Sequence, residues 1–291
     1  MHQDRERLLA DMQSANDSLI VEAAKALMEI GEYGSPAGTY LLAGGQAALR
    51  LRRLADAVVL LYHGLLVAEP NTLVWAEILV NRAIACSRHG FYHDAITAGE
   101  EFLAVLEALP SRAQTWVPHT HHAIGLAYDR LQQYSKAVPH HRIAAEMYPD
   151  PVRHMYSTCD LAYSLALSGD VPGADQVLST VVAVDEATAQ FVFHSTTALV
   201  RYHQGRYSEA VAAGDRADSL ATGNEEAWAL PHAELRYWLS RATWETGDRY
   251  RAAKLGLYAA LVAHHRWHLT LRDAANAWLA EMLSKGGILN A

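Results

Sequence analysis

Small, aromatic and hydrophobic residues recur along the chain in a pattern that predicts pairs of helices. The motif G-x-Y-x-x-A, complete or partial, ends at alanines that lie 36 to 42 residues apart: Ala57, Ala95, Ala137, Ala174, Ala210 and Ala252. Hydrophobic residues on both sides of each motif follow helical spacing, and no long segment alternates with the period of two that a strand requires. A repeat of about this length, with a helix on each side of its turn, is typical of stacked helix hairpins. The pattern therefore predicts an all-α chain.

Each repeat is expected to turn sharply between its two helices. The turns are predicted near residues 52, 90, 132, 169, 205 and 247, and most of them contain a glycine that can take a left-handed backbone and end the first helix. A short polar residue is expected to cap the second helix, as Ser135, Asp170 and Ser208 would do.

The repeats divide the chain into three parts. Residues 1–34 are interpreted as a degenerate N-terminal helix pair, residues 35–267 as the repeats, and residues 268–291 as a capping helix followed by a tail. Because each hairpin buries its apolar face against the next one, we expect a right-handed α-solenoid of about six to seven hairpins with a C-terminal capping helix.

One repeat carries a recognisable family pattern. The family pattern is W-x2-L-G-x2-Y followed by alanine, an aromatic residue, alanine and proline. The stretch from His121 to Pro149 has Ile124-Gly125-x2-Tyr128 and then Ala137, His141, Ala144 and Pro149. It resembles the tetratricopeptide repeat (TPR). The resemblance implies that Gly125 and Ala137 face each other where the two helices cross.

The repeats are longer than the usual TPR unit of about 34 residues. In this respect the chain resembles the repeat domains of bacterial intracellular peptide receptors of the Rap, PlcR and NprR kind, and the sensor arms of large bacterial regulatory ATPases. Such receptors often carry an N-terminal helix-turn-helix. The residues before the first repeat are too few for a DNA-binding domain, which argues against direct control of transcription.

Composition narrows the range of partners. The chain has 32 acidic and 24 basic residues and a formal charge of −8, so direct binding to nucleic acid or to an anionic membrane is not expected. The basic run at Arg50–Leu54 is interpreted as a solvated helix face. The N-terminal residues are too charged for a secretory signal, and no run of about 18 apolar residues occurs, so we expect a cytoplasmic protein.

Catalytic and metal motifs are missing from the sequence. Cys86 and Cys159 lie inside predicted helices and form no Cys-x-x-Cys pair, and no phosphate-binding loop or nucleophile motif is complete. Histidines cluster at His119–His122, His140–His141 and His264–His268, but no nearby residue completes a metal set. The sequence therefore predicts a non-enzymatic protein without cofactor or metal.

A ligand is expected on the inner surface, which the first helix of each TPR hairpin lines. The residues predicted to point there mix aromatic rings, imidazoles, charges and short polar groups, which suits an extended peptide. They are His119, His122, Asp129, Tyr156, Tyr163, Ser195, Tyr202, Glu234, Tyr237, Arg241, Trp244, Arg272 and Asn276. Arg241 with Tyr237 and Trp244 forms the best group, since a cation beside two aromatic residues attracts a carboxylate. The alternative is an ion pair of Arg241 with Glu245 or a contact with Glu234.

The leading functional hypothesis is a peptide- or protein-binding scaffold, in its sharper form a receptor for a short regulatory peptide. A second hypothesis is a structural adaptor that binds another protein or a second copy of the chain. Exposed aromatic residues near the C-terminus, Trp267 and Trp278, would form a homodimer contact; the alternative is that both side chains are buried against the last repeat. A third is the sensor part of a larger transcriptional regulator.

Overall fold

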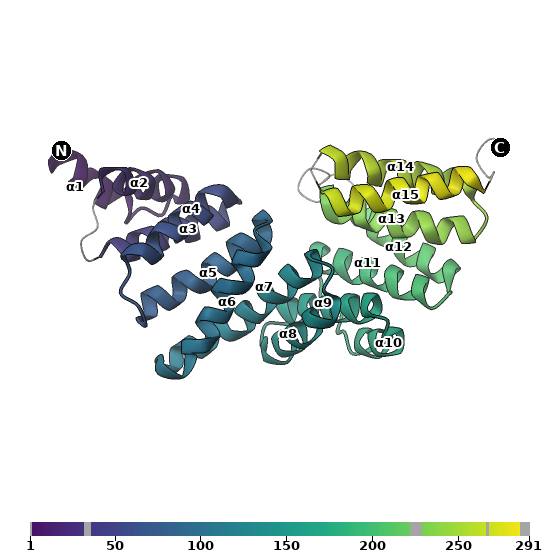
Figure 1. The fold of residues 1–291 in the computed structure, drawn as a ribbon, viewed down its shortest axis with the longest axis horizontal. Helices are drawn as coiled ribbons and strands as arrows, with labels where there is room; N and C mark the ends of the chain where they lie inside the picture. Colours follow the sequence, from purple (N-terminus) through teal and green to yellow (C-terminus); the bar gives the residue numbers. More distant parts are fainter. Residues whose placement is uncertain (1, 32–35, 222–228, 266–267, 286–291) are drawn as a thin grey trace. The chain divides into compact units, whose positions relative to one another are not determined.

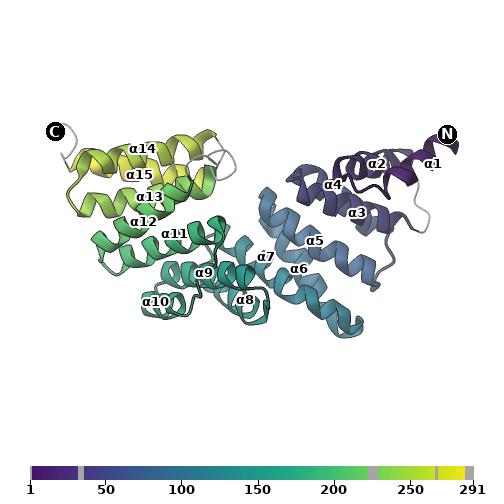
Figure 2. The same cartoon turned by 180° about the vertical axis from the view of Figure 1, so that it is seen from behind.

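The structure is a computed structural model that describes residues 2–31, 36–221, 229–265 and 268–285. These residues form fifteen α-helices and two short 3-10 helices, and they contain no strand, so the prediction of an all-α fold is confirmed. Figures 1 and 2 show the helices following one another in antiparallel pairs. Within this described part, each helix is too short or too polar to serve as a membrane span. The chain divides into two compact units, Met1–Met147 and Tyr148–Ala291, which we call unit 1 and unit 2.

Unit 1 is a series of helix hairpins. Its helices are α1 (His2–Asp11), α2 (Asp17–Ile30), α3 (Ala37–Arg50), α4 (Leu54–Val67), α5 (Leu73–His89), α6 (Tyr92–Val105), α7 (Val117–Arg130) and α8 (Tyr134–Met147). The 3-10 helices η1 (Leu106–Ala108) and η2 (Ser111–Trp116) connect α6 to α7. The first helices of successive hairpins, α3, α5 and α7, contact one another in series, and this places one apolar core between each hairpin and the next.

Unit 2 repeats the arrangement. Its helices are α9 (Pro151–Ser168), α10 (Val171–Ser179), α11 (Ala187–His203), α12 (Tyr207–Ala221), α13 (Ala229–Glu245), α14 (Arg249–His265) and α15 (Leu269–Ser284). The first helices α9, α11 and α13 again contact in series. The last helix, α15, has no second helix after it in the described residues and covers α14, as a capping helix does.

The hairpin turns contain residues with left-handed backbone. These are Arg52, Gly90, Gln132, Gly169, Gly205 and Gly247. At Gly169, φ is +100° and no atom lies within 4 Å of the position that a Cβ would occupy, so the backbone angle alone accounts for the glycine. Arg52 and Gln132 adopt the same left-handed region with φ of +58°, which is energetically unfavourable for a residue with a Cβ atom.

Two substitutions test whether the left-handed backbone angle is what favours glycine in these turns. Gly169→Ala is expected to lower the free energy of unfolding by about 1 kcal/mol, because alanine must keep the left-handed angle. Gln132→Gly is the matched reverse change and should raise it by a few tenths of a kcal/mol up to about 1 kcal/mol. Urea denaturation followed by circular dichroism measures both changes. Equal midpoints for Gly169→Ala and the unsubstituted chain would show that the turn relaxes without cost.

Only one of the three expected caps begins its helix as predicted. The Asp170 carboxylate accepts a hydrogen bond from the Gly173 amide at 3.0 Å, at the start of α10. Ser135 and Ser208 lie inside α8 and α12, which begin one residue earlier, at Tyr134 and Tyr207. The prediction for the two serines is wrong because the helix starts at the tyrosine of the repeat motif.

The crossing of α7 and α8 differs from the TPR expectation in one contact. A Cβ added to Gly125 would lie 2.6–2.8 Å from ring atoms of His141, so the nearest neighbour of Gly125 is His141 and not Ala137. His141 is fully buried, and its Nε2 lies 2.8 Å from a carboxylate oxygen of Asp129. The glycine therefore makes room for an imidazole that a carboxylate holds in place.

A second histidine–carboxylate contact fixes the hairpins of unit 2. Asp218 of α12 lies 2.6 Å from Nε2 of His232 and accepts a hydrogen bond of 2.7 Å from Nε of Arg236, both on α13. The Arg236 guanidinium in turn lies over the Tyr258 ring of α14, 4.0 Å from its centroid. His232 is 1% exposed, so the Asp218 carboxylate contacts an almost fully buried imidazole.

Candidate functional site

The guanidinium of Arg241 lies among four aromatic rings in unit 2. Its Cζ atom is 5.1 Å from the ring centroid of Trp278, 5.3 Å from Tyr202, 5.8 Å from Trp238 and 5.9 Å from Tyr237. These distances are within the range of cation–π attraction. We call Arg241 and these four residues the Arg241 cage. Its members come from α11, α13 and α15, and three of them, Arg241, Tyr202 and Trp238, are only half-buried.

Arg241 forms no salt bridge among the described residues, although its charge contributes to lowering the pKa of the Glu281 carboxyl on α15. Arg241 Nη1 donates to the Tyr237 hydroxyl at 3.1 Å, and its buried Nε makes no hydrogen bond among the described residues. By contrast, Arg201, Arg236 and Arg251 of the same unit each contact an aspartate carboxylate. Among the described residues, Arg241 forms neither the ion pair with Glu245 nor a hydrogen bond with Glu234, the two alternatives that the sequence leaves open.

The surroundings keep Arg241 charged. Burial alone would lower the pKa of its guanidinium, but the hydroxyls of Tyr237 and Tyr202 outweigh burial and raise it. Burial also raises the pKa of Tyr202, so that hydroxyl stays protonated. A fixed positive charge therefore lies in a partly desolvated, ring-lined position, where an anion is attracted more strongly than in water.

Two further tyrosines that were predicted to face inward hold carboxylates in unit 2. The Tyr156 hydroxyl donates to Glu186 at 2.9 Å, and Glu186 also caps the N-terminus of α11. The Tyr163 hydroxyl donates to Glu234, which joins α9 to α13. Burial, followed by the Glu186 carboxylate, raises the pKa of Tyr156 well above its usual range.

The other predicted residues of unit 2 lie in varied settings. Ser195 is half-buried on α11, Arg272 of α15 pairs with its neighbour Asp273, and Asn276 is exposed on the same helix. Tyr237 and Trp244 are 8% and 4% exposed and belong to the apolar core. The structure thus joins Tyr202, Tyr237 and Arg241 in one cluster, whereas Trp244 lies in the apolar core, where its ring contacts Trp278.

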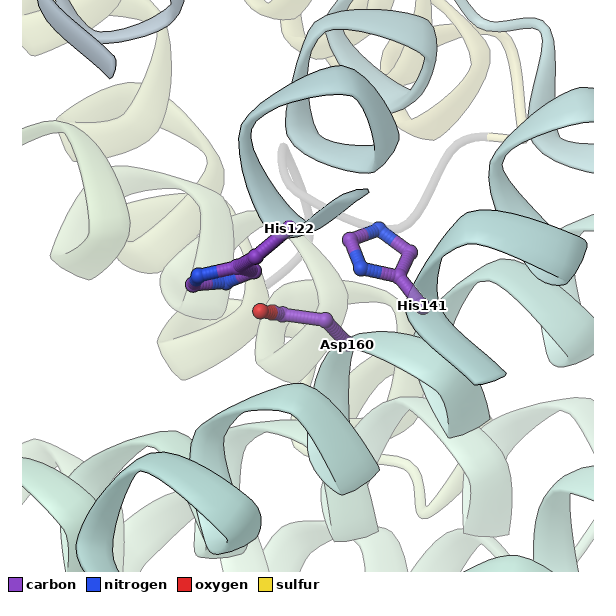
Figure 3. Close-up of side chains that lie close together, drawn as sticks. All are labelled: His122, His141 and Asp160. Atoms are coloured by element: carbon purple, nitrogen blue, oxygen red, sulfur yellow. The ribbon is translucent and has the colours of Figure 1, made fainter. Parts of the chain in front are cut away.

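The predicted residues of unit 1 cluster around the α7–α8 crossing. His119 and His122 are half-buried on α7, and Asp129 contacts His141. Figure 3 shows the side chains of His122 and His141, whose ring centroids are 6.0 Å apart; it also labels Asp160, which belongs to α9 in unit 2. His141 was not among the predicted site residues.

Solved structures share this arrangement of helices. A tetratricopeptide repeat protein from Parabacteroides merdae ATCC 43184 superposes with a TM-score of 0.62 at 17% identity, covering 94% of this chain and 99% of that one. A Rap protein complexed with competence and sporulation factor superposes with a TM-score of 0.57 at 15% identity, covering 97% of this chain and 85% of that one. The chain has the TPR fold. No family model matches the sequence, and no curated protein matches it either.

The TPR helices bring two tryptophans to the cage that the sequence did not assign there. Trp278 is 4% exposed, donates to Ser240 Oγ at 2.8 Å and meets Trp244 edge to face, so it is buried against the last repeat, which is the alternative to exposure at a dimer contact. Trp267 lies outside the described residues. The sequence pattern predicts Tyr237, and not its neighbour Trp238, as the inward residue of that turn. The adjacent pair of large aromatic residues was the available signal.

Proposed function

We propose that this TPR chain is a non-catalytic peptide-binding module and that the Arg241 cage binds a carboxylate of its ligand. The observation that carries the proposal is the half-buried guanidinium, which is surrounded by aromatic rings and contacts no carboxylate in the described residues. Burying a charge without a partner is unfavourable, so a ligand carboxylate would supply the missing interaction.

The chemistry of the cage suits the end of a peptide or an acidic side chain. A planar guanidinium can donate two parallel hydrogen bonds to a carboxylate. The half-buried rings of Tyr202 and Trp238 offer apolar surface to the neighbouring ligand side chain, while their polar edges can remain hydrated. A cation and two adjacent rings therefore favour a carboxylate next to a hydrophobic residue.

The sharper form of the proposal is a receptor for a short regulatory peptide. One neighbour in fold is a Rap protein in complex with competence and sporulation factor, which gives a precedent for a ligand on this architecture. The successive contacts of α9, α11 and α13 supply a continuous row of helices beside the cage, as the extended binding surfaces of solenoid proteins require.

The two cysteines support a non-catalytic role. Burial raises the pKa of the Cys86 thiol to about 11, and it raises that of Cys159 further. A thiol is a nucleophile only as thiolate, which burial disfavours at both positions.

Peptide pools test the proposal. The probes are randomised short peptides without Asp or Glu, prepared once with free C-terminal carboxylates and once with C-terminal amides, and a third amidated pool that contains Asp and Glu. Native mass spectrometry identifies bound peptides, and calorimetry with single selected peptides gives the affinity. We expect ligands from the pools that carry a carboxylate. Arg241→Gln should weaken their binding by about tenfold to a hundredfold, the usual range for a charged hydrogen bond.

Two matched variants complete the design. Arg216→Gln removes an exposed arginine of the same unit and should leave affinity unchanged, whereas Arg241→Lys should restore part of it because the charge returns. Circular dichroism establishes that each variant is folded. Absence of any bound peptide, or equal affinity of the chain and its Arg241→Gln variant, would contradict the proposal.

A further inference from the structure

Four histidines meet where α7 crosses α8 in unit 1. His121 and His122 on α7 lie opposite His140 and His141 on α8, with ring centroids 5.1 Å apart in the first pair and 6.0 Å in the second. The sequence had shown these histidines only as two separate runs. The fold converts the runs into two facing imidazole pairs.

The two pairs differ in what their nitrogens do. His141 is fully buried against Gly125 and contacts Asp129, so its ring serves the packing of the crossing. His121 and His140 are half-buried, and their Nδ1 atoms lie 2.9 Å from each other. The Tyr128 ring lies 5.7 Å from His140, centroid to centroid, tilted by 38°. In this pair, one Nδ1–H donates to the lone pair of the other Nδ1.

The two nitrogens, now joined by a hydrogen bond, are also close enough to be ligands of one metal ion. Two nitrogen ligands that are each about 2.0–2.1 Å from a metal and at a right angle lie about 2.9 Å apart, whereas a tetrahedral angle would separate them by about 3.3 Å. Right-angled nitrogen ligands are typical of tetragonal Cu²⁺ and Ni²⁺ sites, and Cu²⁺ binds most tightly of the divalent first-row ions.

We propose that His121 and His140 chelate Cu²⁺ through their Nδ1 atoms. Each ring must turn so that its Nδ1 lone pair faces the metal and no longer the other nitrogen, and the broad χ2 preference of histidine allows such an adjustment. The ring that holds its proton on Nδ1 takes the other tautomer, with the proton on Nε2, so both Nδ1 lone pairs face the metal and no proton is lost. Water completes the coordination. This site is independent of the Arg241 cage and belongs to the other unit.

Copper titration of the full chain tests the inference. Calorimetry with CuCl₂ in the presence of glycine as a competing chelator should give one tight site, and electron paramagnetic resonance of the 1:1 complex should show coupling to two nitrogens. His121→Ala and His140→Gln should each weaken binding about tenfold or more, because one of two protein ligands is lost. Zn²⁺ should bind more weakly than Cu²⁺.

Two controls separate this pair from other histidines. His122→Ala removes a neighbour on the same helix, and His264→Ala removes an exposed histidine of unit 2; both should keep the affinity and the two-nitrogen signal. Since His140→Gln could disturb the crossing, its circular dichroism and melting are recorded, and the half-buried His121→Ala gives a second, independent measurement. Unchanged copper affinity in the His121→Ala, His140→Gln double variant, or loss of affinity in His122→Ala, would overturn the assignment.

Discussion

Asp218→Ala is expected to lower the free energy of unfolding by about 2–3 kcal/mol. The substitution leaves the imidazole of His232, which is 1% exposed, without its carboxylate and removes two hydrogen bonds from Arg236. Breaking a fully buried pair costs about 3–5 kcal/mol, and the partial exposure of the Asp218 side chain (28%) reduces that figure. Urea denaturation measures the loss.

Asp215→Ala on the same helix is the matched control. Its carboxylate pairs with Arg251, but both side chains are more exposed, at 44% and 38%. An exposed pair contributes about 0–1 kcal/mol, so this variant should remain close to the unsubstituted chain. Equal decreases in the free energy of unfolding for the two variants would mean that burial of the His232 imidazole does not determine the size of the effect.

Acid should distinguish the same two variants. Burial alone would raise the pKa of Asp218, but hydrogen bonds from His232 and Arg236 and the charge of Arg236 hold it well below its usual value of 3.8. A carboxylate whose folded-state pKa is lowered stabilises the fold above its unfolded pKa and loses that contribution as the pH falls. From about pH 5 to about pH 2, Asp218→Ala should therefore lose less stability than Asp215→Ala.

Gly125→Ala is expected to lower the free energy of unfolding by about 1–2 kcal/mol. The added methyl group would lie 2.6 Å from the His141 ring, which is fully buried and held by Asp129, so neither the ring nor its helix can yield easily. Overpacking of this kind costs about 1–3 kcal/mol, more than the helix propensity that alanine gains. Thermal and urea denaturation measure the change.

Gly64→Ala tests whether the rigid His141 ring causes the loss of stability. Gly64 is also a buried helical glycine of unit 1, but its nearest neighbour is the end of the Ile78 side chain at 3.1 Å, which can move by a few tenths of an ångström. The gain in helix propensity of about 1 kcal/mol should offset the contact there and leave stability nearly unchanged. If both alanines were equally harmful, the rigid imidazole would not be the reason.

The fold was predictable because the repeat determines it several times over. Each turn motif contains its own small residue and its own residue with a left-handed backbone. Gly90 or Gly169 therefore marks a helix end even when the other repeats are not considered. Helix starts were less predictable. Asp170 caps α10 as expected, whereas Tyr134 begins α8 ahead of Ser135, since packing can outweigh a capping preference of about 1 kcal/mol.

The candidate site was predictable only in part, because side-chain environment depends on helices distant in sequence. Spacing on one helix brought Tyr237 and Arg241 together correctly. It could not show that Trp278 of α15 reaches the same guanidinium, or that Trp244, one turn further on, turns into the core. The facing of His121 and His140 likewise follows from the angle at which two helices cross, which no single helix encodes.

The hydrogen bond between Tyr163 and Glu234 changes how unit 2 can come apart. Solenoid repeats ordinarily couple to their immediate neighbours, so that a row of them can fray from one end. Here the Tyr163 side chain of α9 forms a hydrogen bond with Glu234 of α13. The bond links the first hairpin of unit 2 to the third, across the hairpin of α11 and α12. Because this hydrogen bond spans the middle hairpin, the three hairpins should unfold in one cooperative transition and not one at a time.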